Sequence, residues 1–208
     1  MGSTRLPGKV LAPLAGRPAL EWVLERLARA EQPASVVVAT SELAADDRIA
    51  DFCRERGVRS YRGPSDDVAH RVLGAARASG LDAFVRVNGD SPLIDQRLVD
   101  RGAELMRQGQ ADLVTNVRPR TFPPGQSVEV IRTAALERAL EDGADDEARE
   151  HVTGPLYGGA FQVVRFANDP PRTTPAYTLD TPADHARLEA ILLDMERPHW
   201  EYSWDELP

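Results

Sequence analysis

Cysteine, long apolar runs and an excess of positive charge are all missing from this sequence. The chain of 208 residues has one cysteine, Cys53, so it holds no intramolecular disulfide and no cysteine-based metal cluster. Lysine and arginine number 25 against 33 aspartates and glutamates, which gives a formal net charge of −8. A protein that coats nucleic acid needs a cationic surplus to release counterions, so we expect no nucleic-acid partner.

Membrane signals are also missing. No stretch is apolar over the ~20 residues that span a bilayer, and no signal-peptide pattern is present. We therefore expect no membrane partner and a cytoplasmic protein. The length suits one sizeable domain, and Cys53 is expected to be a small buried residue on a helix.

Segments with apolar residues at helical spacing alternate with short β-branched runs. Helices are predicted to start at Pro18, Ser65, Asp95 and Pro182 and to cover 49–57 and 133–141. Strands are predicted at 34–40, 83–87, 111–115, 128–131, 161–166 and 177–179. Strands separated by helices form a mostly parallel sheet whose ligands bind at the carboxyl ends of the strands. The prediction is one α/β domain over residues 1–208.

The first candidate for chemistry is the glycine-rich segment GSTRLPGK. Gly2 and Gly8 allow backbone conformations that other residues avoid, and Arg5 and Lys9 bring two cations close together. The segment is not a Walker A loop, because Val10 stands where Ser or Thr should follow the lysine. Such a loop can present backbone N–H groups to phosphate, and the structural alternative is a solvated basic terminus.

Two aspartates follow other predicted strands. Asp90 lies in NGDSP directly after strand 83–87, and Asp180 follows the strand predicted at 177–179. The letters TPAD after Asp180 form a strong helix start, which explains Thr181, Pro182 and Asp184 but not Asp180 itself. Carboxylates suit Mg²⁺, so one hypothesis is a metal pair above the sheet. The alternative for Asp90 is a turn followed by a helix cap.

These motifs resemble the sugar cytidylyltransferases, which include CMP-Kdo synthetase and acylneuraminate cytidylyltransferase. The strongest resemblance is to the branch of spore coat polysaccharide biosynthesis protein F. It rests on GSTRLPGK and GRPALEWVLERL, followed in order by GPSDDVAHR, VRVNGDSPLID, TNVRPRTFPPG, VEV, AREHVTGPLY and YTLDTPADH. The resemblance implies a Rossmann-like nucleotide-diphospho-sugar transferase fold, with three α/β/α layers.

The resemblance also implies a reaction, in which a hydroxyl of a sugar or sugar acid attacks the α-phosphorus of CTP. The products are a CMP-sugar and pyrophosphate, as a precursor step of surface polysaccharide biosynthesis. By the same resemblance, the catalytic residues are Arg5, Lys9 and Asp90, and Mg²⁺ is held by Asp90 and Asp180. The nucleotide-binding residues that it implies are Gly2, Ser3, Arg5, Gly8, Lys9 and Arg71, although Arg71 would look the same as a surface helix arginine.

The chain departs from the family pattern in places. Ser127 in GQSVEV replaces a carboxylate, and Asn88 and Ser91 are small polar replacements. Family members carry a short apolar strand and an arginine ahead of MGSTR. Because a missing central strand would leave two neighbouring strands with unpaired edges, we expect Met1 to be an internal methionine of a longer reading frame. If the chain begins at Met1, weak nucleotide binding and a destabilised or rearranged sheet centre are expected.

Several alternatives stay open. The chain could use another nucleoside triphosphate or another acceptor, or it could be a non-catalytic nucleotide-binding or assembly domain of the same fold. Residues 117–160 are a candidate subregion for acceptor binding or dimerisation, and a homodimer is expected by resemblance only. His151 is expected to be structural. The C-terminal HWEYSWDELP is an edge strand, a packing tail or a partner contact.

Overall fold

The computed structural model describes residues 6–32, 35–141 and 146–208. Its main sheet has four strands in the order β5 (Ala83–Arg86), β7 (Glu129–Arg132), β6 (Leu113–Thr115) and β8 (Val163–Arg165). β7 runs against both β5 and β6, whereas β8 is parallel to β6. Three of the four strands thus share a direction, as expected. Two of the three pairings are nevertheless antiparallel, because the reversed β7 is inserted between β5 and β6.

Two smaller sheets lie nearer the amino end of the chain. β3 (Val37–Ser41) pairs in parallel with β4 (Arg59–Gly63), and β1 (Pro13–Leu14) forms a short antiparallel ribbon with β2 (Arg17–Pro18). β4 was absent from the sequence prediction because its letters RSYRG contain no apolar run or alternation.

Seven α-helices are present in the described part of the chain, and several start as predicted. They are α1 (Ala19–Leu27), α2 (Asp47–Glu55), α3 (Val68–Ala78), α4 (Gln96–Gln108), α5 (Thr133–Glu141), α6 (Asp146–His151) and α7 (Pro182–Leu193). Asp95 caps α4, and Thr181 with Asp184 forms a capping box at the start of α7. The helix start predicted at Ser65 is wrong, since the Asp67 side chain is the cap of α3. No described helix is long and apolar enough to cross a membrane.

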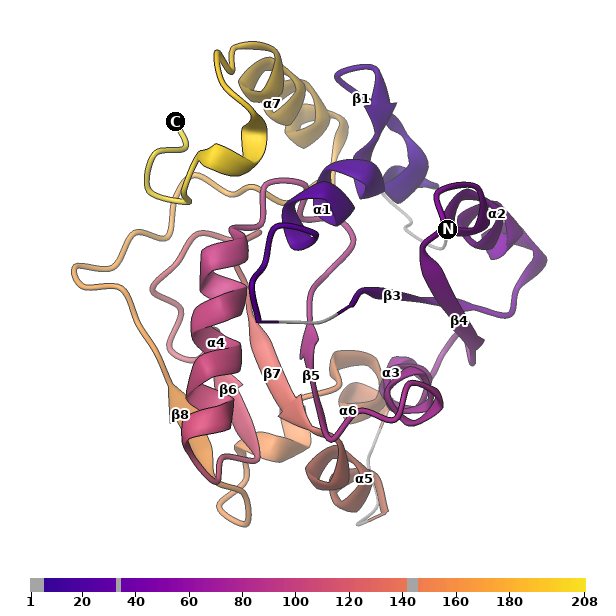
Figure 1. Cartoon of the computed structure of the whole chain (residues 1–208), viewed down its shortest axis with the longest axis vertical. Coiled ribbons are helices and arrows are strands. Elements are labelled where there is room, and N and C mark those ends of the chain that lie inside the picture. The colour runs from indigo at the N-terminus through magenta and orange to yellow at the C-terminus, as the bar shows by residue number, and fades with distance from the viewer. Residues whose placement is uncertain (1–5, 33–34, 142–145) are drawn as a thin grey trace.

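The helices cover both faces of the main sheet. Val114 and Val130 pack into one apolar cluster with α1, α2 and α4, whereas Leu113 and Ile131 pack into another with α3 and α5. Successive side chains of a strand point to opposite faces, so this alternation fixes three layers. Figure 1 shows α4 lying along β6 and β7. The predicted three-layer α/β/α fold is confirmed, and Cys53 is buried on α2 as expected.

Residues 177–179 are not a strand, contrary to the prediction. The Tyr177 N–H donates to the Pro124 carbonyl (2.7 Å) and the Leu179 N–H to the Asp90 carbonyl (2.8 Å). Both acceptors belong to loops, so the segment is extended without joining a ladder. Gly125 permits this approach: its φ is 96°, and a Cβ there would lie 2.7 Å from the Tyr177 carbonyl.

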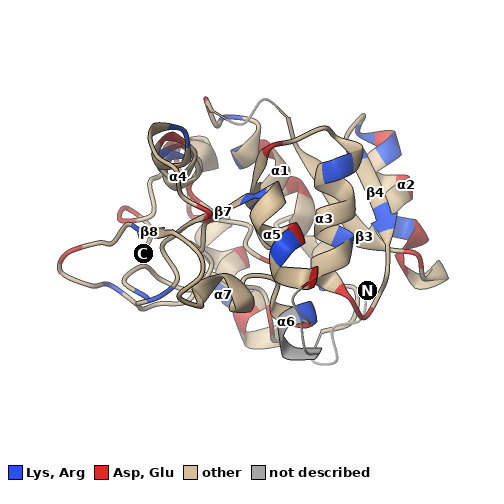
Figure 2. Cartoon of the chain, turned by 90° about the horizontal axis from the view of Figure 1, so that it is seen from below, with Lys and Arg blue, Asp and Glu red and all other residues tan. Residues whose placement is uncertain are grey.

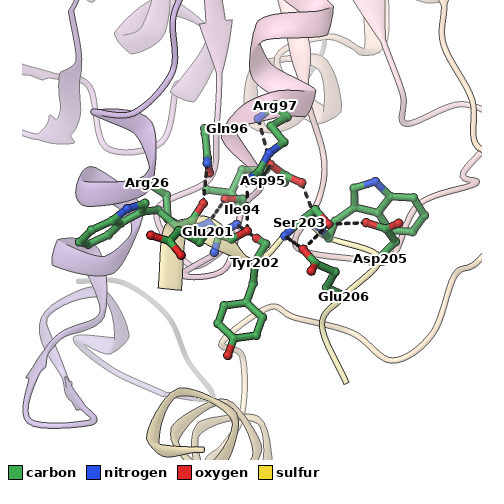
Figure 3. A network of polar contacts seen from close by, with 12 residues as sticks. Arg26, Ile94, Asp95, Gln96, Arg97, Glu201, Tyr202, Ser203, Asp205 and Glu206 are labelled. Atoms are coloured by element: carbon green, nitrogen blue, oxygen red, sulfur yellow. Dashed lines mark hydrogen bonds and ion pairs between the residues drawn. The ribbon is translucent and has the colours of Figure 1, made fainter. Parts of the chain in front are cut away.

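The C-terminal segment packs onto the domain around the buried guanidinium of Arg26 (Figure 3). Arg26 donates to the carbonyls of Ile94, His199 and Tyr202, the last at 2.6 Å. The Trp204 N–H donates to the Asp95 carboxylate at 2.8 Å. Of the three alternatives for this segment, the structure shows a packing tail, which begins with the 3₁₀ turn η4 (His199–Glu201).

Candidate active site

The glycine-rich segment carries Lys9 to the edge of the sheet. Gly8 has a φ of 70°, a left-handed conformation that favours glycine, and it caps the 3₁₀ turn η1 (Lys9–Leu11). The N–H groups of Leu11 and Ala12 donate to the Gly8 carbonyl at 2.9 and 3.1 Å. This tight turn fixes the direction in which Lys9 leaves the backbone. Gly2, Ser3 and Arg5, which were also predicted, lie outside the described residues.

The two predicted aspartates meet above the sheet. Asp90 follows β5, and the hydrogen bond from the Leu179 N–H to the Asp90 carbonyl brings Asp180 beside it. The capping box at Thr181 then starts α7 immediately after Asp180. Asp180 therefore lies between an extended segment and a helix, both of which restrict its backbone.

Lys9 joins these two carboxylates. Its Nζ lies 2.6 Å from an Asp90 oxygen and 2.8 Å from an Asp180 oxygen. Burial lowers the pKa of Lys9, but hydrogen bonds and attraction from Asp180 and Asp90 outweigh burial and leave that pKa above its ordinary value. Lys9 is therefore held in its charged form between the two carboxyl groups.

Lys9 is also the only lysine in a sequence that otherwise uses arginine as its cationic residue. An ammonium is a compact charge with three donors, whereas a guanidinium is a broad planar fork. The compact group suits a position between two carboxylates that both lie within 2.8 Å of it. The structure thus brings together three predicted residues, while their catalytic roles stay predictions.

The same two carboxylates fit a magnesium ion. Because both contact one ammonium group, they are close enough to contact one cation together. The described residues contain no group of three or more His, Cys, Asp or Glu side chains suited to a metal. Mg²⁺ commonly takes one or two carboxylates and completes its octahedron with water and phosphate oxygens. The site therefore suits a metal that arrives with a phosphate ligand.

Arg71 faces the same cleft from α3. Its Nη1 donates to the carbonyls of Pro64 and Ser65, and burial lowers the pKa of its guanidinium. Its buried Nε has no hydrogen-bond partner in the described part of the chain. A buried donor without a partner is costly, so this nitrogen is well suited to a ligand oxygen.

The cleft itself has a volume of about 740 Å³, and we name two groups of its lining residues, the polar mouth and the apolar stem. The polar mouth consists of Lys9, Arg71, Asn88 and Asp90. The apolar stem lies between the strands β3 and β5 and is lined by Leu20, Val23 and Leu24 of α1 and by Val72, Ala75 and Ala76 of α3. Charged ligand groups suit the mouth, and the side chains of the stem favour apolar groups.

A second polar group, which we call the Glu129 cluster (Arg86, Glu129, Thr153 and Tyr157), was not predicted as a site. The buried Glu129 carboxylate contacts Arg86 Nη1 at 2.8 Å and accepts from the hydroxyls of Thr153 at 2.7 Å and Tyr157 at 3.2 Å. Glu129 pairs with Arg86, the last residue of β5, and Arg86 lines the cleft. Charged residues inside the apolar strand letters AFVRV and VEV were the available signal.

The side chains of two other predicted positions make no hydrogen bond or ion pair with Lys9, Asp90 or Asp180 within the described residues. His151 is exposed at the end of α6. Ser127 accepts a hydrogen bond from Arg120 Nη1 at 3.2 Å. Figure 2 shows Lys and Arg interspersed with Asp and Glu over the helices of that view.

Solved structures place the fold in a class. The chain superposes on a cytidylyltransferase from Leptospira borgpetersenii serovar Hardjo-bovis with a TM-score of 0.92, 31% identity, and coverage of 100% of this chain and 88% of that one. A structure of CMP:2-keto-3-deoxy-manno-octonic acid synthetase complexed with CTP has a TM-score of 0.72 at 19% identity, with coverage of 92% and 94%. The fold is that of a Rossmann-like nucleotidyltransferase.

Sequence comparison gives the family. Residues 1–186 match the family described as Cytidylyltransferase, and the chain belongs to that family. It is 31% identical to the spore coat polysaccharide biosynthesis protein SpsF of Bacillus subtilis over 203 residues, which cover 92% of this chain and 82% of SpsF. It is 35% identical to a 3-deoxy-manno-octulosonate cytidylyltransferase of Anaeromyxobacter dehalogenans over 176 residues, 77% of this chain and 71% of that protein. The predicted family is confirmed.

Replacing Tyr157 with Phe should change how stability depends on alkaline pH. Burial raises the pKa of Tyr157, and the Glu129 carboxylate adds to this, giving a pKa of about 12 despite the hydrogen bond to Thr115. Since an unfolded tyrosine ionises near 10, stability is lost between about pH 10 and 12. We expect Tyr157→Phe to remove roughly 1–2 kcal/mol of that loss, measured by urea unfolding across this range. Identical slopes for the two proteins would contradict the assignment.

Proposed function

We propose that this chain transfers CMP from CTP to a hydroxyl of a sugar or sugar acid and releases pyrophosphate. The observation that carries the proposal is the contact of Lys9 with Asp90 and Asp180 at the polar mouth, in a member of the cytidylyltransferase family. The similarity to a 3-deoxy-manno-octulosonate cytidylyltransferase supports a sugar acid as the acceptor. The similarity to SpsF supports a role in making surface polysaccharide.

The residues of the mouth suit attack at a phosphorus atom. A triphosphate carries close to four negative charges, which oppose the approach of an oxygen nucleophile. The Lys9 ammonium and the unpartnered Arg71 Nε can both contact phosphate or nucleotide oxygens, which lowers that opposition and orients the nucleotide. Mg²⁺ held by Asp90 and Asp180 would supply further charge neutralisation when bound.

The acceptor is proposed to lie against the Glu129 cluster, of which Glu129, Thr153 and Tyr157 belong to the subregion 117–160 that the sequence analysis singled out. This cluster contributes hydroxyl, carboxylate and guanidinium groups near the end of β5, from which Asp90 also follows. Such groups suit the hydroxyls and carboxylate of a sugar acid. The apolar side chains of the stem offer no hydrogen bonds to such an acceptor.

A pyrophosphate-release assay tests the proposal. Each of the four nucleoside triphosphates is combined with Mg²⁺ and a panel of sugar acids, phosphosugars and neutral sugars. We expect turnover with CTP and a sugar acid, and none when the acceptor is left out. Turnover with another triphosphate would identify a different nucleotidyltransferase. CTP binding without turnover on any acceptor would favour a non-catalytic binding domain.

Replacing Asp180 with Asn should raise the requirement for Mg²⁺. One of two carboxylate ligands becomes neutral, so we expect the Mg²⁺ concentration for half-maximal activity to rise about 10-fold or more. Asp194→Asn at the exposed other end of α7 is the matched control and should leave that concentration unchanged. Equal Mg²⁺ dependence in the two variants would contradict a metal at Asp180.

A further inference from the structure

The side chain of Gln126 is fully buried and pairs with the backbone of the loop that carries Asp90. Its Oε1 accepts from the Asp95 N–H at 2.8 Å, and its Nε2 donates to the Leu93 carbonyl at 2.8 Å. The amide thus contacts this loop at two points, much as a residue of a neighbouring strand would. Because Asp95 also caps α4, the loop is fixed firmly at the end that lies away from β5.

The turn 123–126, which carries this amide, also contacts the segment that leads to Asp180. Its Pro124 carbonyl accepts from the Tyr177 N–H at 2.7 Å. Tyr177 is fully buried, and its hydroxyl donates to the C-terminal tail, which fixes the same segment from another side. The turn therefore contacts both of the segments that end in the carboxylates of the mouth.

A third contact joins those two segments to each other. The Leu179 N–H donates to the Asp90 carbonyl at 2.8 Å. Each of the three segments, namely the loop after β5, the turn 123–126 and the segment ahead of α7, is thus hydrogen-bonded to the other two. In a closed set of this kind no segment can shift without breaking or straining its contacts with both of the others. The spacing between Asp90 and Asp180 therefore depends on the turn.

The surroundings of position 126 require an amide. A buried polar side chain is unfavourable unless its hydrogen bonds are made, and here Leu93 offers an acceptor while Asp95 offers a donor. A carboxylate has no donor for the Leu93 carbonyl. An apolar side chain would leave both backbone groups without this partner. The amide of Gln126 satisfies both groups at once.

We propose that Gln126 is a positioning residue for the carboxylates of Asp90 and Asp180. Its amide holds the turn against the loop after β5, and the turn holds the segment ahead of α7. Both carboxylates are thereby kept at the spacing at which the Lys9 ammonium contacts the two together. The inference rests on the proposed function for the task of the two carboxylates, and it adds the residue that sets their spacing.

Gln126→Met tests the inference, because methionine has a similar length and removes both hydrogen bonds. Gln96→Met is the matched control, since Gln96 is also buried but donates at 2.7 Å to the Trp200 carbonyl of the tail (Figure 3). Gln126→Asn, whose shorter amide cannot keep both contacts, is the milder variant if Gln126→Met does not fold. Two quantities are measured for each protein: the exchange rate of the Leu179 amide without ligands, by NMR, and the Mg²⁺ concentration for half-maximal pyrophosphate release.

We expect Gln126→Met to speed exchange of the Leu179 amide by about 10-fold or more, because the loop that accepts its hydrogen bond has lost a support. The Mg²⁺ concentration for half-maximal activity should rise about 10-fold. Excess Mg²⁺ should restore most of kcat, because both carboxylates are present and only their spacing is altered. Gln126→Asn should change both quantities in the same direction, and Gln96→Met should match the wild-type protein.

Equal Leu179 exchange in the Gln126 variants, in Gln96→Met and in the wild-type protein would overturn the inference. Faster exchange with an unchanged Mg²⁺ requirement would overturn it too, because Gln126 would then support the loop without positioning the carboxylates. The exchange measurement needs neither CTP nor turnover. A wild-type protein that transfers no CMP would therefore reject the proposed function, while Leu179 exchange would still decide whether Gln126 holds the two segments together.

Discussion

Lys9→Met should lower kcat/KM for pyrophosphate release by about 1,000-fold or more, because it removes the cation placed between Asp90 and Asp180. Losing one well-placed donor to developing charge commonly costs 100- to 1,000-fold, and here a full positive charge is lost as well. Lys9→Arg keeps the charge but replaces a compact ammonium with a broad fork, so we expect only partial recovery.

The Lys9→Met variant should bind Mg²⁺ more tightly than the wild-type protein when no nucleotide is present. In the wild-type protein the Lys9 ammonium contacts the two carboxylates that would hold the metal. Without it, the two carboxylates repel each other, and a divalent cation relieves that repulsion. Calorimetry with Mg²⁺ alone measures this. Lower activity together with unchanged Mg²⁺ affinity would mean that the metal binds elsewhere.

Because Lys9 is the only lysine, the rate at which its amine reacts with a chemical reagent reports on its surroundings. An amine-directed acylating reagent has Lys9 as its only side-chain target in this chain. The raised pKa of Lys9 keeps the amine protonated and slow to react at neutral pH. Exposed Arg48→Met on α2 is a matched control for loss of one positive charge and should keep both activity and labelling unchanged.

Much of this site follows from the sequence because of how strands are arranged. Asp90 and Asp180 are 90 positions apart, yet residues that follow extended segments at one edge of a sheet are brought together by the fold. The contact with Lys9 needed one further feature, the left-handed Gly8 that starts η1. Each of these residues stands in a local pattern that predicts its position.

The parts that escaped prediction lack such a pattern. Glu129 becomes a polar centre through Arg86, Thr153 and Tyr157, which approach from other parts of the chain. β4 is polar along its length and is a strand because its neighbour β3 supplies a pairing edge. Tertiary contacts decide both cases, and periodicity within a short window does not report them.

Arg26→Met should lower the free energy of unfolding by about 3–5 kcal/mol. The main cause is that buried carbonyl groups lose their hydrogen-bond donor, and the loss of the positive charge matters less. Burial lowers the pKa of Arg26 to about 10, which shows that burying the guanidinium is itself unfavourable. The charge is held by three carbonyls, those of Ile94, His199 and Tyr202. A methionine side chain fills a similar volume but donates no hydrogen bond, so all three carbonyl acceptors lose their partner.

The loss should also be local at first, since two of the three carbonyls belong to the C-terminal tail. We expect Arg26→Met to speed amide exchange near Trp204, whose N–H donates to Asp95, before the sheet opens. Urea unfolding measures the global change, and Arg48→Met supplies the matched control, because that exposed arginine lies on α2 away from these contacts. If Arg26→Met and Arg48→Met unfold at the same urea concentration, the carbonyls are satisfied by water, and the tail is held by its apolar contacts alone.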